Sequence, residues 1–246
     1  NKEALKGKHF EISSFVTYAS MNSGISITGP KGVLGASISL ENFLGFEKTV
    51  WVPSFYFKYA FTRRSSIYAE YYNIHRSIKY DVNGEFEFGD TIVPVDIGTI
   101  KIYFNTDIWS VGYRYSLINS TKADLSFFFN IYAIRVGTGI DADKTNLIKN
   151  YSFTAPLPSF GYQFSYEMAK NLYFGASMSF FVLQISDFGG FINNTRISVD
   201  YKTSKWLNLG LGFNYFKLQI KTSEKNFKTD IEYSYSGPTL FAKFTF

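Results

Sequence analysis

The chain has 246 residues, a formal net charge of +5 and no cysteine. Aromatic residues make up 20% of the chain and charged residues 18%, a balance that excludes an intrinsically disordered protein. The missing cysteine excludes disulfide frameworks, cysteine-ligated zinc and thiol catalysis, and the scattered basic residues argue against a nucleic-acid partner.

The chain is expected to form one domain, because no linker rich in proline, glycine or serine divides it. Residues 1–8, "NKEALKGK", predict a short polar lead-in at the N-terminus, and residues 9–246 predict the folded body. No uncharged stretch approaches the run of about 20 apolar residues that a membrane-spanning helix needs. If this chain enters a membrane, it must therefore do so as a closed β-barrel.

Alternation of apolar and polar residues, the sign of a half-buried β-strand, recurs along the chain. It places ten strands, at 9–20, 49–61, 66–80, 99–117, 124–139, 154–167, 171–186, 191–202, 206–222 and 228–246. Short and long connections alternate between these strands, as in a barrel with short periplasmic turns and long outer loops. An even strand count returns both termini to the periplasm. The segments 31–46 and 84–95 could instead extend strands and change the count by two.

Two strands show the alternation most clearly. In 207–215 the odd positions are apolar and the even positions are asparagine or glycine, and in 172–182 the even positions are apolar. A water-soluble sandwich would also alternate, but its polar face would carry charges rather than glycine and serine. The prediction is therefore an all-β, antiparallel, up-and-down transmembrane barrel whose apolar positions face lipid and whose small polar positions face the lumen.

The apolar positions change parity at two places. After Tyr215 they move to the even positions 216, 218 and 220, and upstream of Gly237 and Pro238 they move to 231, 233 and 235. A β-bulge, or the passage of the strand out of the bilayer, would explain each change.

The chain closes on an alternating strand that ends in an aromatic residue. Leu240, Phe244 and Phe246 share one parity in the closing "GPTLFAKFTF". This pattern resembles the signal that the outer-membrane assembly machinery reads in its barrel substrates. The resemblance implies that machinery as a partner during biogenesis.

Most of the chain, roughly residues 10–246, resembles a widespread and largely uncharacterised family of bacterial outer-membrane barrels, porin-like or OmpW-like. The stretches that carry the resemblance are "ISLENFLGFEKTVWVPSFYFKYAF", "FEFGDTIVP", "WSVGYRYSLI", "APLPSFGYQFSY" and "GPTLFAKFTF". The resemblance implies a β-barrel in the outer membrane of a Gram-negative bacterium. It implies no catalytic or ligand residues. OmpW-like barrels are smaller than this chain, so the resemblance implies no particular transported solute.

Residues for catalysis are scarce. Histidine is the usual general base, and only His9 and His75 occur, each expected near a rim of the barrel. No G-x-S-x-G motif supplies an activated serine. The sequence therefore predicts no catalytic residues and no enzyme.

The segment "DADKTN" at 141–146 has the alternate oxygen ligands of a calcium loop. It lacks the glycine at the sixth position, where Asn146 stands, and the acid at the twelfth, where Ser152 stands. A plain extracellular loop is favoured, and no metal or cofactor is expected.

Inward parity collects eight charged residues near the periplasmic ends of the strands. They are Glu11, Lys58, Glu70, Arg114, Glu167, Arg196, Asp200 and Lys243. Four are acidic and four are basic, so a network is expected in which Arg114, Arg196 and Lys58 bridge Glu70, Glu167 and Asp200 and fill the lumen. A charged constriction that selects solutes is the alternative.

Barrel size connects this network to function. A barrel of about eight strands holds only side chains, whereas 16–18 strands leave an aqueous channel. The favoured hypothesis is a filled, non-enzymatic barrel that serves as an accessory or scaffolding subunit of an outer-membrane assembly. The alternative is a narrow channel or transporter for small or apolar solutes. The expected partners are outer-membrane lipids, the assembly machinery and another outer-membrane protein complex.

Overall fold

The computed structural model describes residues 10–28, 34–88, 91–142, 147–185, 187–224 and 227–246, which form one sheet of eleven antiparallel strands. The strands are β1 (Phe10–Thr28), β2 (Leu34–Ser39), β3 (Thr49–Ala60), β4 (Ser65–Phe88), β5 (Thr91–Asn119), β6 (Ala123–Ala142), β7 (Leu147–Ala169), β8 (Leu172–Ile185), β9 (Phe188–Lys202), β10 (Leu207–Glu224) and β11 (Phe227–Thr245). In the described part of the chain, no helix is long and apolar enough to cross a bilayer.

Ten of the strands close into a ring. The last strand, β11, pairs with both β10 and β1, and β1 in turn pairs with β3. At the seam between the chain ends, the Phe10 amide donates to the Phe246 carbonyl (3.3 Å) and the Phe246 amide donates to the Phe10 carbonyl (2.9 Å). Closure pairs the backbone groups that an open edge would expose to lipid. The predicted ten-stranded antiparallel barrel is confirmed.

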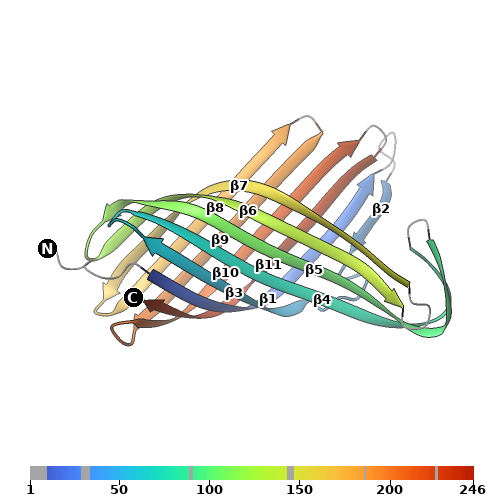
Figure 1. The fold of residues 1–246 in the computed structure, drawn as a ribbon, viewed down its shortest axis with the longest axis horizontal. Coiled ribbons are helices and arrows are strands. Elements are labelled where there is room, and N and C mark those ends of the chain that lie inside the picture. The colour runs from blue at the N-terminus through green and yellow to red at the C-terminus, as the bar shows by residue number, and fades with distance from the viewer. Residues whose placement is uncertain (1–9, 29–33, 89–90, 143–146, 186, 225–226) are drawn as a thin grey trace.

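Strand β1 begins and β11 ends at the same end of the barrel (Figure 1). We call this the terminal end and the opposite one the loop end. The short connections 61–64, 120–122, 170–171 and 203–206 lie at the terminal end.

The strands are longer than the sequence predicted. β4 has 24 residues and β5 has 29, whereas about 9–11 residues cross a bilayer. The connections 21–48, 81–98 and 140–153 between the predicted strands were expected to be long loops, which is wrong for most of their length. In their place, β1 runs on to Thr28, β2 forms within 31–46, and β4 and β5 continue as a paired hairpin to Phe88 and Thr91. The alternative that 84–95 extends strands is confirmed.

The wall is irregular on one side of the loop half. β1 pairs with β3 through Ser20 and with the short strand β2 from Gly24 onward. β4 pairs with β3 over Ser66–Tyr72, and its next residues, 73–79, pair with β5 alone among the described strands. Residues 40–48, which we call the bridging segment, connect β2 to β3 at this place and bury Leu40 and Phe46 against the interior.

Burial confirms the predicted faces of the strands in the terminal half. On β10, Leu209, Leu211 and Phe213 are 49–63% exposed on the outside, whereas Asn214 is buried inside. On β8, Val182 is exposed and Ser179 is buried. The outer apolar side chains form a belt around the barrel, the surface that lipid chains would cover.

The two changes of parity have a different cause from a β-bulge. The ladder of β10 with β9 and β11 runs without a register shift through Phe216 and Gly237, so the bulge interpretation is wrong. Phe216, Leu218 and Tyr235 are at most 2% exposed inside the barrel. The same set of positions faces inward along the whole strand, but the residue types on the two faces exchange. Beyond the belt, polar side chains face outward and apolar ones fill the interior, as in a water-soluble barrel.

Candidate functional site

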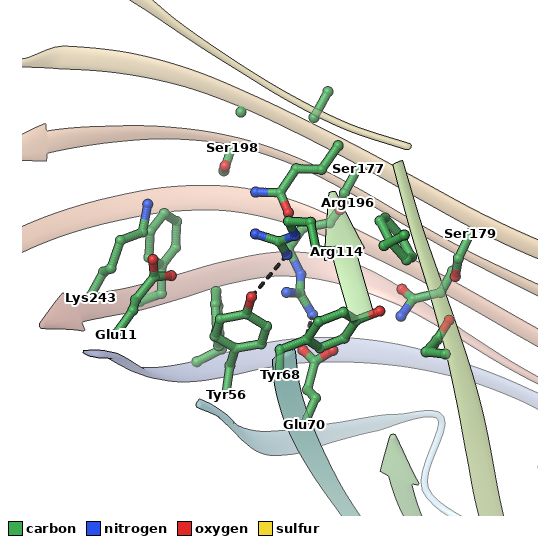
Figure 2. A pocket seen from close by; sticks show the side chains of 18 of the residues that line it. Glu11, Tyr56, Tyr68, Glu70, Arg114, Ser177, Ser179, Arg196, Ser198 and Lys243 are labelled. Carbon is green, nitrogen blue, oxygen red and sulfur yellow. Dashed lines mark hydrogen bonds and ion pairs between the residues drawn. The ribbon is translucent and has the colours of Figure 1, made fainter. Parts of the chain in front are cut away.

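The eight predicted lumen charges share one region, the interior of the terminal half, which we call the charged layer. Inward-facing positions of six strands hold seven of them, and β7 holds Glu167 close to its end. Figure 2 shows Glu11, Glu70, Arg114, Arg196 and Lys243 converging on one space.

Three ion pairs organise the charged layer. Arg196 Nη2 lies 2.8 Å from Glu70 Oε1, and the same nitrogen donates to the Tyr72 hydroxyl at 3.2 Å. Lys58 pairs with Glu11 across the β1–β3 ladder, at positions directly opposite in register.

The third pair joins Lys243 on β11 to Asp200 on β9, with 3.5 Å between Nζ and Oδ2. Asp200 is 4% exposed and also accepts a 2.6 Å hydrogen bond from the side-chain amide of Asn208. This carboxylate is therefore held between two donors.

The pairing differs from the predicted network at Asp200, whose partner is Lys243, and at three further positions. Lys58 pairs with Glu11, because β1 and β3 are neighbours, and not with the predicted acids. Glu167 accepts a hydrogen bond from the Asn171 amide (3.2 Å) in the turn to β8, which places it outside the network. Asn171 has a φ of 65°, so its amide in this left-handed turn needs a local acceptor.

Arg114 is the last difference. Its Nη2 donates to the Tyr56 hydroxyl at 2.9 Å, and its guanidinium lies over the Tyr68 ring, 5.3 Å from the centroid. No carboxylate of the described residues lies within ion-pair distance of it.

An aromatic cluster supports these charges. Its five members, Phe15, Tyr56, Tyr68, Phe128 and Phe241, are each 5–8% exposed. Arg196 lies 4.5 Å from the centroid of Phe15, so ring faces partly replace the water that a guanidinium would otherwise hold.

A cavity of about 110 Å³ lies among the charged layer and the aromatic cluster. Its wall on β8 and β9 carries small residues, including Gly175, Ser177, Ser179 and Ser198 (Figure 2). Small side chains on one wall facing aromatic ones on the other leave this part of the lumen incompletely filled.

Between the cavity and the loop end, the lumen is filled by apolar side chains. Tyr72, Ile108, Ile134 and Phe216 are completely buried and Tyr132 is 2% exposed, within one cluster of buried residues. The Tyr132 hydroxyl receives a 3.2 Å hydrogen bond from Asn194, which also donates to Tyr72. The apolar cluster therefore separates the cavity from the loop end.

A further ion pair, which no sequence pattern indicated, lies inside the loop half. Arg76 Nη1 lies 2.5 Å from Glu41 Oε1, and the two side chains are 2% and 4% exposed. Ser23 joins them, donating from its backbone amide to Glu41 (2.9 Å) and accepting from Arg76 at its hydroxyl (2.6 Å). Inward parity on β4 could have identified Arg76, but Glu41 fell in a segment that was expected to be a loop.

Burial and hydrogen bonds from Ser23 and Arg76 shift the pKa of the Glu41 carboxylate in opposite directions. Burial raises the pKa of this group, and the hydrogen bonds outweigh it, so the pKa of Glu41 lies below its ordinary value of 4.5. Glu41 is therefore charged at neutral pH and ties the bridging segment to β4.

The remaining candidates lie apart from the lumen. His75 is exposed on the outer wall, 3.3 Å from Asp107, with Tyr71 and Asn73 bonded to the same carboxylate. His9 and residues 143–146 of the calcium-like segment lie outside the described residues. In the described part of the chain, no group of three or more histidine, aspartate or glutamate side chains is placed to hold a metal ion.

The residues of the expected assembly signal lie on the outside of β11. Leu240 and Phe246 are 57% and 54% exposed, and the Phe244 ring stacks on Trp206 with 5.8 Å between centroids. They are accessible at the terminal end, and their recognition by the assembly machinery stays a prediction.

Comparison with known proteins finds relatives by structure alone. No family model and no curated protein sequence matches the chain. The outer-membrane protease OmpT of Escherichia coli superposes with a TM-score of 0.66 at 8% identity, covering 100% of both chains. The fold is that of an outer-membrane β-barrel. At this identity the likeness extends to the fold and not to the activity.

Two further barrels match at lower scores. The attachment invasion locus protein Ail of Yersinia pestis has a TM-score of 0.38 at 11% identity, covering 94% of this chain and 99% of its own. The toluene transporter TodX of Pseudomonas putida has a TM-score of 0.35 at 8% identity, covering 97% and 90%.

Proposed function

We propose that this protein is a closed, non-conducting barrel of the outer membrane that serves as an accessory or scaffolding subunit, without catalysis of its own. The observation that carries the proposal is the apolar cluster that fills the loop half of the lumen. Side chains such as Ile108 and Phe216 are completely buried there, and in this proposal their packing blocks an aqueous path from end to end.

The outer wall offers the surface for this role. Beyond the belt, β10 and β11 present a polar outer face that includes Lys217, Gln219 and Glu232. A rigid, closed barrel that projects from the membrane with such a face can orient a partner protein of complementary charge. In this proposal the terminal end faces the periplasm, lipid covers the belt, and the projecting wall meets the partner.

Planar-bilayer recording tests the closed lumen. Wild-type protein should give no steady, ion-carrying openings, whereas Phe216→Ala combined with Tyr132→Ala should give conductance, because both large side chains fill the lumen. A matched control is Phe213→Ala combined with Tyr215→Ala, which truncates exposed side chains on the outside of β10. Steady openings from wild-type protein would contradict the proposal.

Purification from native membranes in mild detergent tests the scaffolding role. A partner should co-purify in fixed stoichiometry with wild-type protein and be lost when Lys217 and Gln219 are both changed to glutamate. Release of the barrel as a free monomer from native membranes, with no crosslinked partner, would refute this role and leave the closed lumen standing.

One observation favours the narrow-channel alternative. The bridging segment closes the loop half of the wall where residues 73–79 of β4 have no neighbour on one side among the described strands. Withdrawal of this segment would open the apolar interior sideways. Entry of an apolar fluorescent solute into the interior of wild-type protein, blocked by a disulfide that ties the segment to β4, would favour this alternative.

A further inference from the structure

The charged layer has more positive than negative side chains around its cavity. The charged residues that line the cavity are Glu11, Glu70, Arg114, Arg196 and Lys243, which leaves one positive charge in excess. Lys58 and Asp200, which pair with members of this set, add one charge of each sign and do not change the excess.

The excess charge belongs to Arg114. Arg196 has Glu70 and Lys243 has Asp200, each within 3.5 Å. Glu11 interacts electrostatically with Arg114, but it also interacts with Lys58 and Lys243, so one carboxylate serves three cations.

Asp124 is the other acid that interacts electrostatically with Arg114, but it does not line the cavity and lies beyond ion-pair distance. Its carboxylate accepts hydrogen bonds from Ser116 (2.8 Å) and Ser126 (2.5 Å). Arg114 keeps one polar atom, Nε, that is buried without a hydrogen-bond partner among the described residues. A partly buried guanidinium with no carboxylate in contact has lost water and can accept a further hydrogen-bonding partner.

The space next to Arg114 suits a small guest. The cavity of about 110 Å³ far exceeds the roughly 10–15 Å³ that a single water needs by the same measure. Its wall offers donors besides Arg114, among them the hydroxyls of Ser177 and Ser198 (Figure 2). The excess of one charge favours a guest with one negative charge.

We propose that the cavity beside Arg114 binds a small, singly charged anion, of the size of a halide or formate. The anion supplies the charge that the protein lacks at this place and accepts hydrogen bonds from the guanidinium and the serine hydroxyls. The apolar cluster above the cavity holds it as a bound ion rather than one in transit.

Crystals of the wild-type protein soaked in sodium bromide test the site directly. Anomalous density for bromide is expected within hydrogen-bonding distance of the Arg114 guanidinium. A cavity that holds only water in saturating bromide would overturn the proposal, whatever the barrel conducts.

Thermal unfolding in detergent gives the second test. The melting temperature in sodium chloride should exceed that in sodium gluconate, whose anion is much larger than chloride, and should rise with the logarithm of chloride concentration. Arg114→Met should lose this dependence, whereas Arg135→Met, which removes an exposed arginine of β6, should keep it. Equal melting temperatures of the wild type in both salts, or retained dependence in Arg114→Met, would overturn the proposal.

A third variant guards against misfolding of Arg114→Met. Gln163 lines the same cavity, and Gln163→Glu adds a fixed negative charge with almost no change of shape. This variant should fold, and its melting temperature should depend on chloride less than that of the wild type. An unchanged dependence would argue against an anion in this cavity.

Discussion

Arg196 and Glu70 connect opposite sides of the barrel. Their side chains meet at 2.8 Å, although four strands separate β9 from β4 in either direction around the ring. The pair therefore spans the lumen, and we call it the strut. Arg196 also lies over the Phe15 ring and donates a hydrogen bond to the Tyr72 hydroxyl.

Glu70→Gln should destabilise the barrel by about 3 kcal/mol, since it leaves the Arg196 guanidinium buried without its carboxylate. Denaturant unfolding in detergent, followed by the shift between folded and unfolded bands in electrophoresis, measures the loss. The control is Glu232→Gln, which breaks the half-exposed pair with Lys217 (2.6 Å) and should cost less than about 1 kcal/mol. Equal losses for the two variants would contradict the strut.

Gly237 allows β11 and β1 to approach closely. A Cβ atom at this position would lie 1.9 Å from the Tyr18 carbonyl oxygen, which belongs to the backbone and cannot turn aside. Gly237→Ala should therefore weaken barrel closure and lower the unfolding midpoint. Gly137→Ala is the matched control, because nothing lies within 4 Å of its Cβ position. If both variants fold with the same midpoint, the close approach is not required.

Single cysteines can map the inversion of faces, since the chain has none of its own. Leu211→Cys should react with a lipid-phase reagent, Lys221→Cys with a water-soluble one, and Asn214→Cys with neither in the folded protein. These expectations follow from exposed positions within and beyond the belt and from the 2% exposure of Asn214. Reaction of Lys221→Cys with the lipid-phase reagent alone would show that the belt extends further than proposed.

The sequence predicted the ring of ten strands and their faces because alternation reports which side of a strand meets a given environment. It could not predict where the bilayer ends. Phe216 and Tyr235 have the opposite parity to the lipid-facing residues of their strands, and only the unbroken ladder shows that they lie inside rather than beyond a β-bulge.

The candidate site was predictable as a set of residues but not as pairs. The alternation of their strands predicted that Arg196 and Glu70 both face the lumen. Which charges meet across the lumen depends on barrel curvature and on the size of side chains such as Tyr56. The Tyr56 hydroxyl accepts a hydrogen bond from the Arg114 guanidinium. The pair of Glu41 with Arg76 needed the fold of the bridging segment, which no local pattern specifies.

Glu41 should control the bridging segment in a pH-dependent way. Its pKa in the folded protein lies below 4.5, because hydrogen bonds from Ser23 and Arg76 outweigh burial. A lowered folded pKa means that the contribution of Glu41 to stability is fully present above pH 4.5 and is lost as the pH falls through the folded value. Acid should therefore loosen the segment from β4.

Amide hydrogen exchange measures this locally. The Leu40 and Met21 amides donate to Ser23 and Lys48 carbonyls (3.0 and 2.7 Å), so their exchange reports whether the segment is seated. Glu41→Gln leaves Arg76 buried without a carboxylate and should speed their exchange at pH 7 by tenfold or more, about 1.4 kcal/mol of local stability. Exchange in Phe213 of β10 should not change. As the pH falls below 4.5, wild type should approach Glu41→Gln in local stability, once both are corrected for the intrinsic effect of pH on exchange. A constant difference between the two proteins from pH 7 to pH 3 would show that Glu41 does not hold the segment through its charge.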